Sequence, residues 1–171
     1  DSLAASGRRA SKVTANVEAY ANEARQLAAA ADRARAGGLP LGPLHGLPIC
    51  IKDLCDIDGR IGTIGSKMWA GRRASATSAT VERLRAAGMI PLGKTHMVEF
   101  AFGAWGTNPL MGAPWNPWDS ARHRVPGGSS SGTAVAVAAG LAPAGIGSDT
   151  GGSVRIPSAF NGLVGLKVTY G

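Results

Sequence analysis

The sequence predicts a single α/β domain, and three observations support this prediction. The chain has 171 residues, enough for one domain with a sizeable buried core. Its composition is 44% hydrophobic and 17% charged, which is typical of a globular protein and not of a disordered one. A short apolar run (47–51), a helical pattern (78–87) and a second apolar run (89–92) follow one another. A strand, a helix and a strand in this order indicate a parallel α/β unit.

The first elements follow from the pattern of apolar residues. Residues 11–36 are rich in Ala, Glu, Gln and Arg, and apolar side chains return every three or four positions, so we expect one amphipathic helix that ends at Gly37 and Gly38. The run 47–51 is apolar on both faces, as a strand in the middle of a covered sheet should be. The domain, 1–171, therefore divides into an N-terminal helix region, 1–38, and a core, 39–171.

The second half of the chain is less regular. Residues 102–128 show no helical or strand period, and a long irregular segment in a compact domain is more often functional than accidental. A Gly-Ser loop, 127–132, opens a helix of small residues at 133–139. After it we expect a short strand, a short helix and a last strand, at 144–147, from about 153, and at 162–166.

Charge and hydropathy bear on location and partners. The formal net charge is +7, but the arginines are scattered and few aromatic residues lie among them, so we expect a solvated surface and no nucleic-acid partner. The longest apolar stretch, 134–147, is shorter than the ~18 residues of a membrane span and contains Pro143. The first residues lack the apolar core of a secretory signal, and the start at Asp1 indicates a fragment or a processed form. We expect a cytoplasmic protein with no membrane partner.

The two cysteines do not predict a metal site. Cys50 and Cys55 stand five positions apart, with no Cys or His around them at the spacing of zinc ligands. We expect two small buried thiols, and nothing in the sequence requires an oxidising compartment.

Two Gly-Ser loops, 127–132 and 147–153, are the densest chemistry in the sequence. The first fits the opening of a phosphate-binding loop, but Thr133 stands where that motif requires lysine. It also fits the nucleophile elbow Gly-x-Ser-x-Gly, in which the catalytic histidine follows the serine. All three histidines precede Ser130, so that order cannot be completed within this chain.

A serine can also be activated by a lysine, provided that burial lowers the lysine pKa from its reference of about 10.4. The chain has five lysines. Lys52 and Lys94 each close an apolar strand, where active sites of α/β folds collect. The pattern of residues does not decide between these two.

Three motifs together resemble the amidase signature family. The segment 42–53, Gly-Pro-Leu-His-Gly-Leu-Pro-Ile-Cys-Ile-Lys-Asp, is similar to the lysine motif of that family. The loop 127–132 is similar to its first serine loop, and 147–157 to its nucleophile loop. Ser153 follows Ser129 by 24 positions, a spacing that also agrees with the family. The resemblance covers residues 39–171.

The resemblance implies a fold and a mechanism. The fold would be a mixed central β-sheet covered by helices on both faces. Lys52 would be the base, Ser129 a bridging serine preceded by a cis peptide bond, and Ser153 the nucleophile of a serine hydrolase. This enzyme would cleave an amide C–N bond through an acyl-enzyme, without cofactor or metal. The oxyanion hole would consist of the backbone N–H groups of Thr150, Gly151, Gly152 and Ser153.

The resemblance also suggests contacts for a small-molecule amide substrate, with candidates Ser130, Arg155 and Trp105. For Arg155 an ion pair with Asp149 or Asp53 is the alternative, and for Trp105 it is ordinary packing. Ser129 and Ser153 taken singly could be helix caps. The sequence leaves a homo-oligomer open.

The chain departs from the family pattern at three places. Ser131 replaces a glycine and adds a hydroxyl that could compete for hydrogen bonds near Ser129, and Cys50 replaces an aliphatic residue. The chain ends at Gly171, whereas the family's domain continues, so we expect the N-terminal part of that domain. Two alternatives to a free amidase stay open. One is the glutamine-hydrolysing A-type subunit of a tRNA-dependent amidotransferase, which works with partner chains, and the other is an inactive fragment or binding module.

Overall fold

The computed structural model describes residues 13–170 as a sheet with helices on both faces. The sheet has four strands in the order β1-β3-β2-β4, where β1 pairs with β3 in antiparallel fashion and the other neighbours are parallel. The strands are β1 (Asn16–Ala19), β2 (Pro48–Lys52), β3 (Ile90–Thr95) and β4 (Gly145–Ile146).

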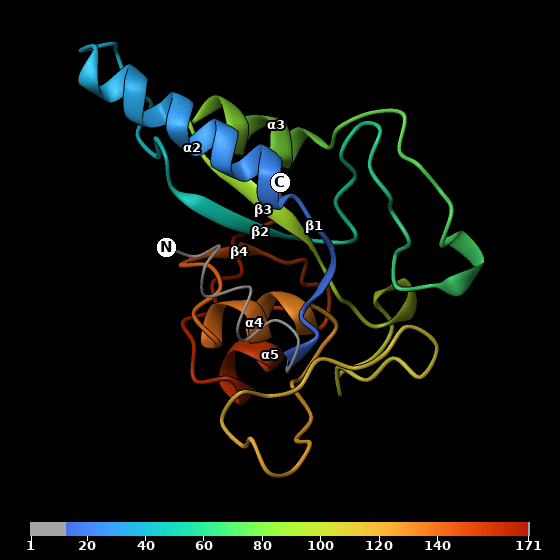
Figure 1. The fold of residues 1–171 in the computed structure, drawn as a ribbon. Helices are drawn as coiled ribbons and strands as arrows, with labels where there is room; N and C mark the ends of the chain where they lie inside the picture. Colours follow the sequence, from blue (N-terminus) through green and yellow to red (C-terminus); the bar gives the residue numbers. More distant parts are fainter. Residues whose placement is uncertain (1–12, 171) are drawn as a thin grey trace.

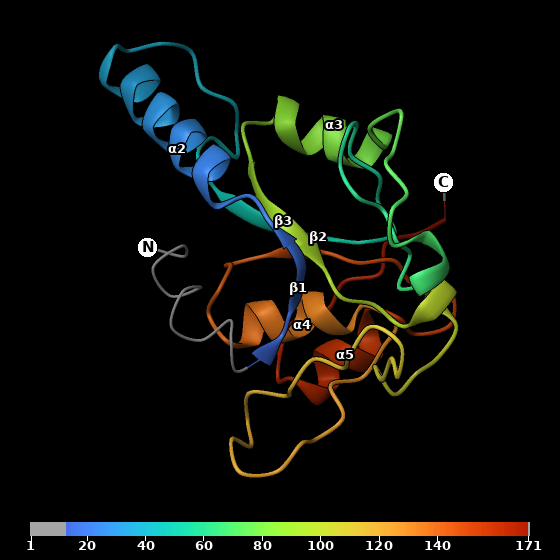
Figure 2. The ribbon, with the colours of Figure 1, turned by 45° about the vertical axis from the view of Figure 1, so that its right-hand side comes forward.

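Within residues 13–170, four α-helices flank the sheet: α2 (Ala21–Ala36), α3 (Ala79–Ala86), α4 (Ser131–Ala138) and α5 (Arg155–Phe160). Helices α2 and α3 lie on one face, and α4 lies on the other with α5 beside it (Figures 1 and 2). Short 3₁₀ helices, η1 (Lys67–Trp69) and η2 (Glu99–Ala101), lie in loops of the described chain. The prediction of a mixed sheet with helices on both faces is confirmed.

Strand β2 is buried on both faces, as its apolar sequence predicts. Ile49 and Ile51 join the core on the α3 side, whereas Cys50 joins the core on the α4 side. This alternation is the ordinary pleat of a strand, in which successive side chains point to opposite faces. The same pleat determines where the next residue of the strand, Lys52, points.

The expected helix over residues 11–36 is wrong at its start. Residues 11 and 12 lie outside the described part, β1 occupies Asn16–Ala19, and the helix begins at Ala21. Residues around β1 bond to β3 through Tyr20 N–H to Leu92 O (2.9 Å) and His96 N–H to Ala15 O (2.9 Å). Pairing with the free edge of a sheet therefore overrides the local helical pattern. The region 1–38 contributes a strand to the sheet as well as a helix.

The strand expected at 162–166 is also wrong. Residues 163–170 form neither helix nor strand, and Val164 and Leu166 are exposed. A strand needs a neighbour to satisfy its backbone groups, and within residues 13–170 none pairs with this segment. The other predicted helices and strands are confirmed, with boundaries shifted by one to three residues.

The irregular segment 102–128 is confirmed as free of helix and strand within the described chain. Its two ends are joined by hydrogen bonds from Gly127 N–H to Trp105 O (3.1 Å) and from Gly128 N–H to Ala104 O (2.7 Å). These bonds hold the start of the first Gly-Ser loop, 127–132, just before α4 begins.

Gly93 allows β1 to approach β3 closely. A Cβ atom at Gly93 would lie 2.2 Å from the carbonyl oxygen of Glu18 in β1. We therefore expect Gly93→Ala to force the strands apart and to lower the free energy of unfolding of the intact protein by about 1–3 kcal/mol, measured by urea denaturation. Gly71→Ala is the control, because no atom lies within 4 Å of its added Cβ. Equal midpoints for both variants would contradict this account of the β1–β3 contact.

Candidate active site

The two lysines that the sequence left as alternatives point to opposite faces of the sheet. In the parallel register of β2 and β3, Lys52 lies beside Thr95, and Lys94 lies beside Ile51. Side chains at paired positions of a sheet share a face. Lys52 therefore points toward α4 and the serine loops, whereas Lys94 points toward the side that Ile51 shares with α3.

Lys52 is held by two serines. Its side chain is fully buried, and Nζ donates to Ser129 Oγ at 2.7 Å and to Ser148 Oγ at 2.8 Å. Burial lowers the pKa of Lys52 to about 8, while the nearby Cys55 and Asp149 act in the opposite direction. A lysine in this state exchanges a proton near neutral pH, and Ser129, itself fully buried, is within reach of that proton.

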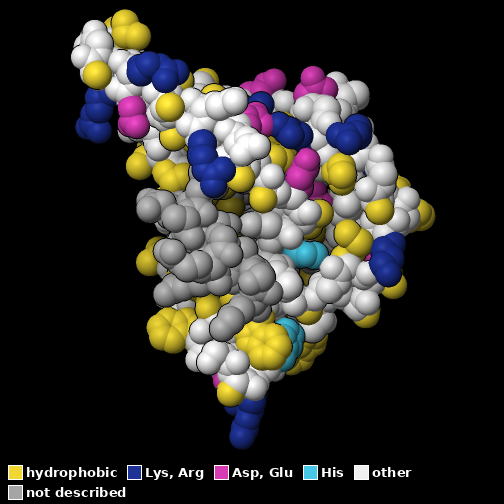
Figure 3. Space-filling view, viewed as in Figure 1, with side chains coloured by type: hydrophobic (Ala, Val, Ile, Leu, Met, Phe, Trp, Pro, Cys, Tyr) yellow, Lys and Arg dark blue, Asp and Glu magenta, His cyan; other side chains and the backbone are white. Residues whose placement is uncertain are grey.

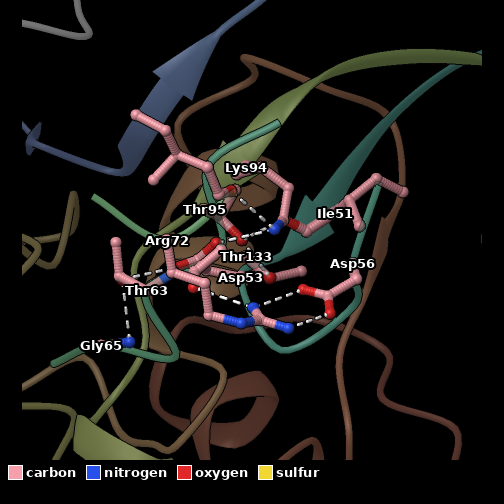
Figure 4. A network of polar contacts seen from close by, with 11 residues as sticks. Ile51, Asp53, Asp56, Thr63, Gly65, Arg72, Lys94, Thr95 and Thr133 are labelled. Atoms are coloured by element: carbon pink, nitrogen blue, oxygen red, sulfur yellow. Dashed lines mark hydrogen bonds and ion pairs between the residues drawn. The ribbon is translucent and has the colours of Figure 1, made fainter. Parts of the chain in front are cut away.

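Lys94 is held differently, by a buried carboxylate. Its Nζ lies 2.7 Å from Asp53 Oδ1, and both side chains are fully buried. Figure 4 shows Asp53 between Lys94 and Thr63, whose backbone N–H donates to Asp53 Oδ2 at 3.0 Å. The charge of Lys94 is thus compensated within the fold. The geometry favours Lys52 over Lys94 as the candidate base.

The two Gly-Ser loops meet next to Lys52. The Gly128–Ser129 peptide bond is cis, as the family resemblance implies. Ser130 N–H donates to Ser153 O at 3.2 Å, and the buried Ser130 Oγ bonds to the backbone N–H and carbonyl of Ser148, at 3.3 and 3.4 Å. Ser130, a candidate substrate contact, thus joins one loop to the other.

Ser153 lies at the turn before α5, half-buried, and its side chain makes no hydrogen bond with any residue of 13–170. The N–H groups of Thr150, Gly151 and Ser153 are likewise without a partner in that part of the chain. The Gly152 N–H, in contrast, donates to Asp149 Oδ1 at 2.7 Å. Three of the four predicted oxyanion donors are therefore open to a ligand in this structure, and the fourth is occupied.

Arg155 forms the ion pair with Asp149 that the sequence offered as an alternative to substrate binding. Its Nε lies 3.0 Å from Asp149 Oδ2, and its Nη2 lies 3.0 Å from Oδ1. The Arg155 guanidinium, with backbone N–H groups, holds the pKa of Asp149 well below its usual range. Trp105 is 65% exposed and lines a groove of about 450 Å³ with Phe102 and Val98, so dense packing does not account for its position.

The remaining predictions concern cysteines, charge and hydropathy. Cys50 is buried, and burial raises its pKa to about 12, whereas Cys55 is only partly buried. Among residues 13–170, no cluster of His, Cys, Asp and Glu could hold a metal ion. Within that range no helix has the length and hydrophobicity of a membrane span. Figure 3 shows Lys and Arg side chains dispersed over one face and mixed with acidic ones.

Comparison with known proteins agrees with this geometry. The family model described as amidase matches residues 2–171.

The chain belongs to the amidase family.

Among curated relatives, the A-type subunit of the glutamyl-tRNA(Gln) amidotransferase of Cupriavidus metallidurans is 54% identical over 84% of this chain. The native peptide amidase of Stenotrophomonas maltophilia superposes with a TM-score of 0.84, 36% identity and 94% coverage of this chain. A solved protein from a complex that bears on the origins of an s-triazine catabolic enzyme gives a TM-score of 0.86, with 41% identity over 92% of this chain. The present chain covers 28% of the length of the first of these relatives and 34% of the length of each of the two solved chains.

Sequence reasoning missed one partner of the candidate base, Ser148, and the full extent of the contacts of Asp149. Both residues lie inside the motif 147–157 that carries the family resemblance. A carboxylate followed within a few residues by two glycines is a signal for a turn in which the side chain accepts backbone N–H groups. That signal identifies Asp149, whereas the bond from Lys52 to Ser148 depends on tertiary structure alone.

The buried pair of Lys94 and Asp53 predicts a large effect of breaking it. Asp53→Asn would leave a fully buried ammonium without its counter-charge, so we expect the free energy of unfolding of the intact protein to fall by about 3–5 kcal/mol in urea denaturation. Asp56→Asn is the matched control, because Asp56 pairs with Arg72 where both side chains are about one-third exposed. For this control we expect a loss of about 1 kcal/mol or less. Similar losses for the two variants would show that burial of the Lys94 pair has no special weight.

Proposed function

We propose that this protein is a serine hydrolase that cleaves a carboxylic amide C–N bond through an acyl-enzyme. Ser153 is the nucleophile, Ser129 the bridging serine and Lys52 the base. The observation that supports this most strongly is the 2.7 Å hydrogen bond between Lys52 Nζ and Ser129 Oγ, because it brings a buried lysine with a lowered pKa into direct contact with a serine hydroxyl. Family membership supports the reaction class.

In the proposed reaction, neutral Lys52 accepts the proton of Ser129 while Ser129 accepts the proton of Ser153. The Ser153 oxygen then attacks the amide carbonyl and forms a tetrahedral intermediate. Collapse of the intermediate breaks the C–N bond, and the leaving amine takes the proton back along the same path. Water then enters, loses a proton by the same relay and releases the carboxylic acid from Ser153.

The tetrahedral intermediate carries a negative charge on oxygen, which needs donors that are already in place. The free N–H groups of Thr150, Gly151 and Ser153 are assigned this role, and each such donor is typically worth about 10²- to 10³-fold in rate. The space beside Gly151 is open in this structure, because no atom lies within 4 Å of the position that a Cβ on this residue would take.

A second candidate is the A-type subunit of a glutamine-dependent amidotransferase that acts on glutamyl-tRNA(Gln). It is favoured by the 54% identity to such a subunit, which exceeds the identity to either of the solved chains compared above. The two candidates share the chemistry of Ser153 and differ in what receives the released ammonia. Hydrolysis of simple amides by the purified protein alone would favour the free amidase, whereas glutamine hydrolysis that needs partner chains would favour the amidotransferase.

Labelling with a serine-directed fluorophosphonate tests the proposed nucleophile. We expect an adduct on Ser153 of the intact protein, located by peptide mapping, because a deprotonated serine displaces fluoride from phosphorus. Ser153→Ala should abolish the adduct, and Lys52→Ala should slow its formation by about 10²- to 10⁴-fold. Lys67→Ala, at an exposed lysine, is the matched control and should label at the wild-type rate. A folded protein that forms no adduct would instead support an inactive fragment or binding module.

The pH dependence tests the base. Because Lys52 acts in its neutral form and its pKa is lowered to about 8, we expect kcat/KM to rise about tenfold per pH unit below pH 8 and to level off above it. Rates measured from pH 5.5 to 10 on one amide substrate check this. A rate that stays level across the whole range would rule out a titrating lysine base.

A further inference from the structure

The carboxylate of Asp149 accepts an unusually large number of hydrogen bonds, and the proposed reaction gives this residue no role. It follows Ser148 in the loop between β4 and α5, and its side chain is 2% exposed. Its carboxylate oxygens accept five hydrogen bonds from residues that surround Ser153. The donors are Gly152 N–H (2.7 Å), Val154 N–H (3.1 Å), and Arg155 N–H (3.2 Å), Nε (3.0 Å) and Nη2 (3.0 Å).

We propose that Asp149 is the positioning residue of the candidate active site and that Arg155 acts through it. This inference rests on the proposed function, in which Ser153 is the nucleophile. Gly152 and Val154 are the two neighbours of Ser153, and both donate to the same carboxylate. The backbone of Ser153 is thereby fixed on each side by one buried anion, and hydrogen bonds to an anion are about twice as strong as neutral ones.

The same loop also fixes the base. Ser148, next to Asp149, accepts a hydrogen bond from Lys52 Nζ at 2.8 Å and donates its backbone N–H to Ser130 Oγ at 3.3 Å. Asp149 thus stands between the segment that holds Lys52 and the segment that carries Ser153. Its bond to Gly152 turns that N–H away from the site and leaves the N–H groups of Thr150, Gly151 and Ser153 as the open donors.

Arg155 lies on the solvent side of Asp149, with 55% of its side chain exposed. Two of its guanidinium nitrogens bond to the two carboxylate oxygens, a geometry that fixes the plane of the carboxylate. We therefore assign Arg155 to ordering the loop and not to binding a substrate carboxylate.

Asp149→Asn in the intact protein tests the inference, since asparagine keeps the shape but removes the charge and one acceptor oxygen. We expect backbone amide exchange of residues 150–155 to become at least about tenfold faster. We expect kcat to fall by about 10²-fold with KM changed less than about threefold, as small misplacements of reacting groups do. The midpoint of the pH–rate profile should move to lower pH, because the negative charge of Asp149 raises the pKa of Lys52. A general loss of stability would not move this midpoint.

Asp119→Asn is the matched control. Asp119 also accepts two backbone N–H groups, from Ala121 and Arg122, and pairs with the guanidinium of Arg124, but it lies in the irregular segment 102–128. We expect wild-type exchange at 150–155, wild-type kcat and an unchanged pH midpoint. Arg155→Met is a second test variant that keeps the carboxylate and its backbone bonds, so it remains informative if Asp149→Asn does not fold. It should lower kcat at constant KM, whereas a rise in KM at constant kcat would overturn the assignment of Arg155.

The outcomes separate this inference from the proposed function. Wild-type exchange at 150–155 together with wild-type kcat in Asp149→Asn would overturn the positioning role, even if Ser153→Ala is inactive. Faster exchange in Asp149→Asn, with hydrolysis that survives Ser153→Ala, would support the ordering of the loop by Asp149 and overturn Ser153 as the nucleophile.

Discussion

The burial of two lysines in neighbouring strands is the constraint on which the site depends. Lys52 is the last residue of β2 and Lys94 the last but one of β3; they lie one register position apart and are both fully buried. An unpaired ammonium in the interior is costly, and the fold reduces that cost in two ways. Lys94 forms an ion pair with a buried carboxylate. Lys52 instead donates hydrogen bonds to two serine hydroxyls, and its pKa is lowered by burial. The pleat sends the two side chains to opposite faces of the sheet, so the Asp53 carboxylate that stabilises the charge of Lys94 does not raise the pKa of Lys52.

The α4 face of the sheet is built to leave this lysine with hydroxyl partners. Beside Lys52, Thr95 Oγ1 lies 2.7 Å from Thr133 Oγ1 of α4, so the neighbouring polar side chains bond to each other. The core on this face includes small residues such as Ala136 and Ala139, which allow α4 to lie close to the strands. The start of α4 carries Ser129 and Ser130 directly to the ends of the strands. The small residues of α4 therefore serve two purposes, because the close packing of this helix also brings the serine loop that precedes it to the ends of the strands.

Local patterns were enough to predict most of the fold and part of the site. The strands β2 and β3, the helices α3 and α4 and the irregular segment 102–128 have clear signals in apolar period, glycine and proline. The strand at the start of the described chain has no such signal, because Asn16–Ala19 pairs with β3, which lies more than 70 positions further along the sequence. The residues 162–166 look like a strand but find no partner within 13–170. The resemblance names Lys52 and Ser129 as candidates, but residue types cannot reveal that Ser148 also accepts a hydrogen bond from this lysine, since that bond joins residues 96 positions apart.

The separation of the site residues along the chain has a consequence for folding. The hydrogen bond from Lys52 to Ser129 closes a loop of 77 residues, and the bond to Ser148 closes one of 96. The contacts within helices α2 and α3 join near neighbours in the sequence, whereas the bonds of Lys52 join segments that meet at the parallel pairs of β2 with β3 and β4. Non-local pairing of this kind is slow compared with helix formation. We therefore expect the arrangement around Lys52 to assemble after the helices, so that a chain with its helices already formed would not yet hold Lys52 against Ser129.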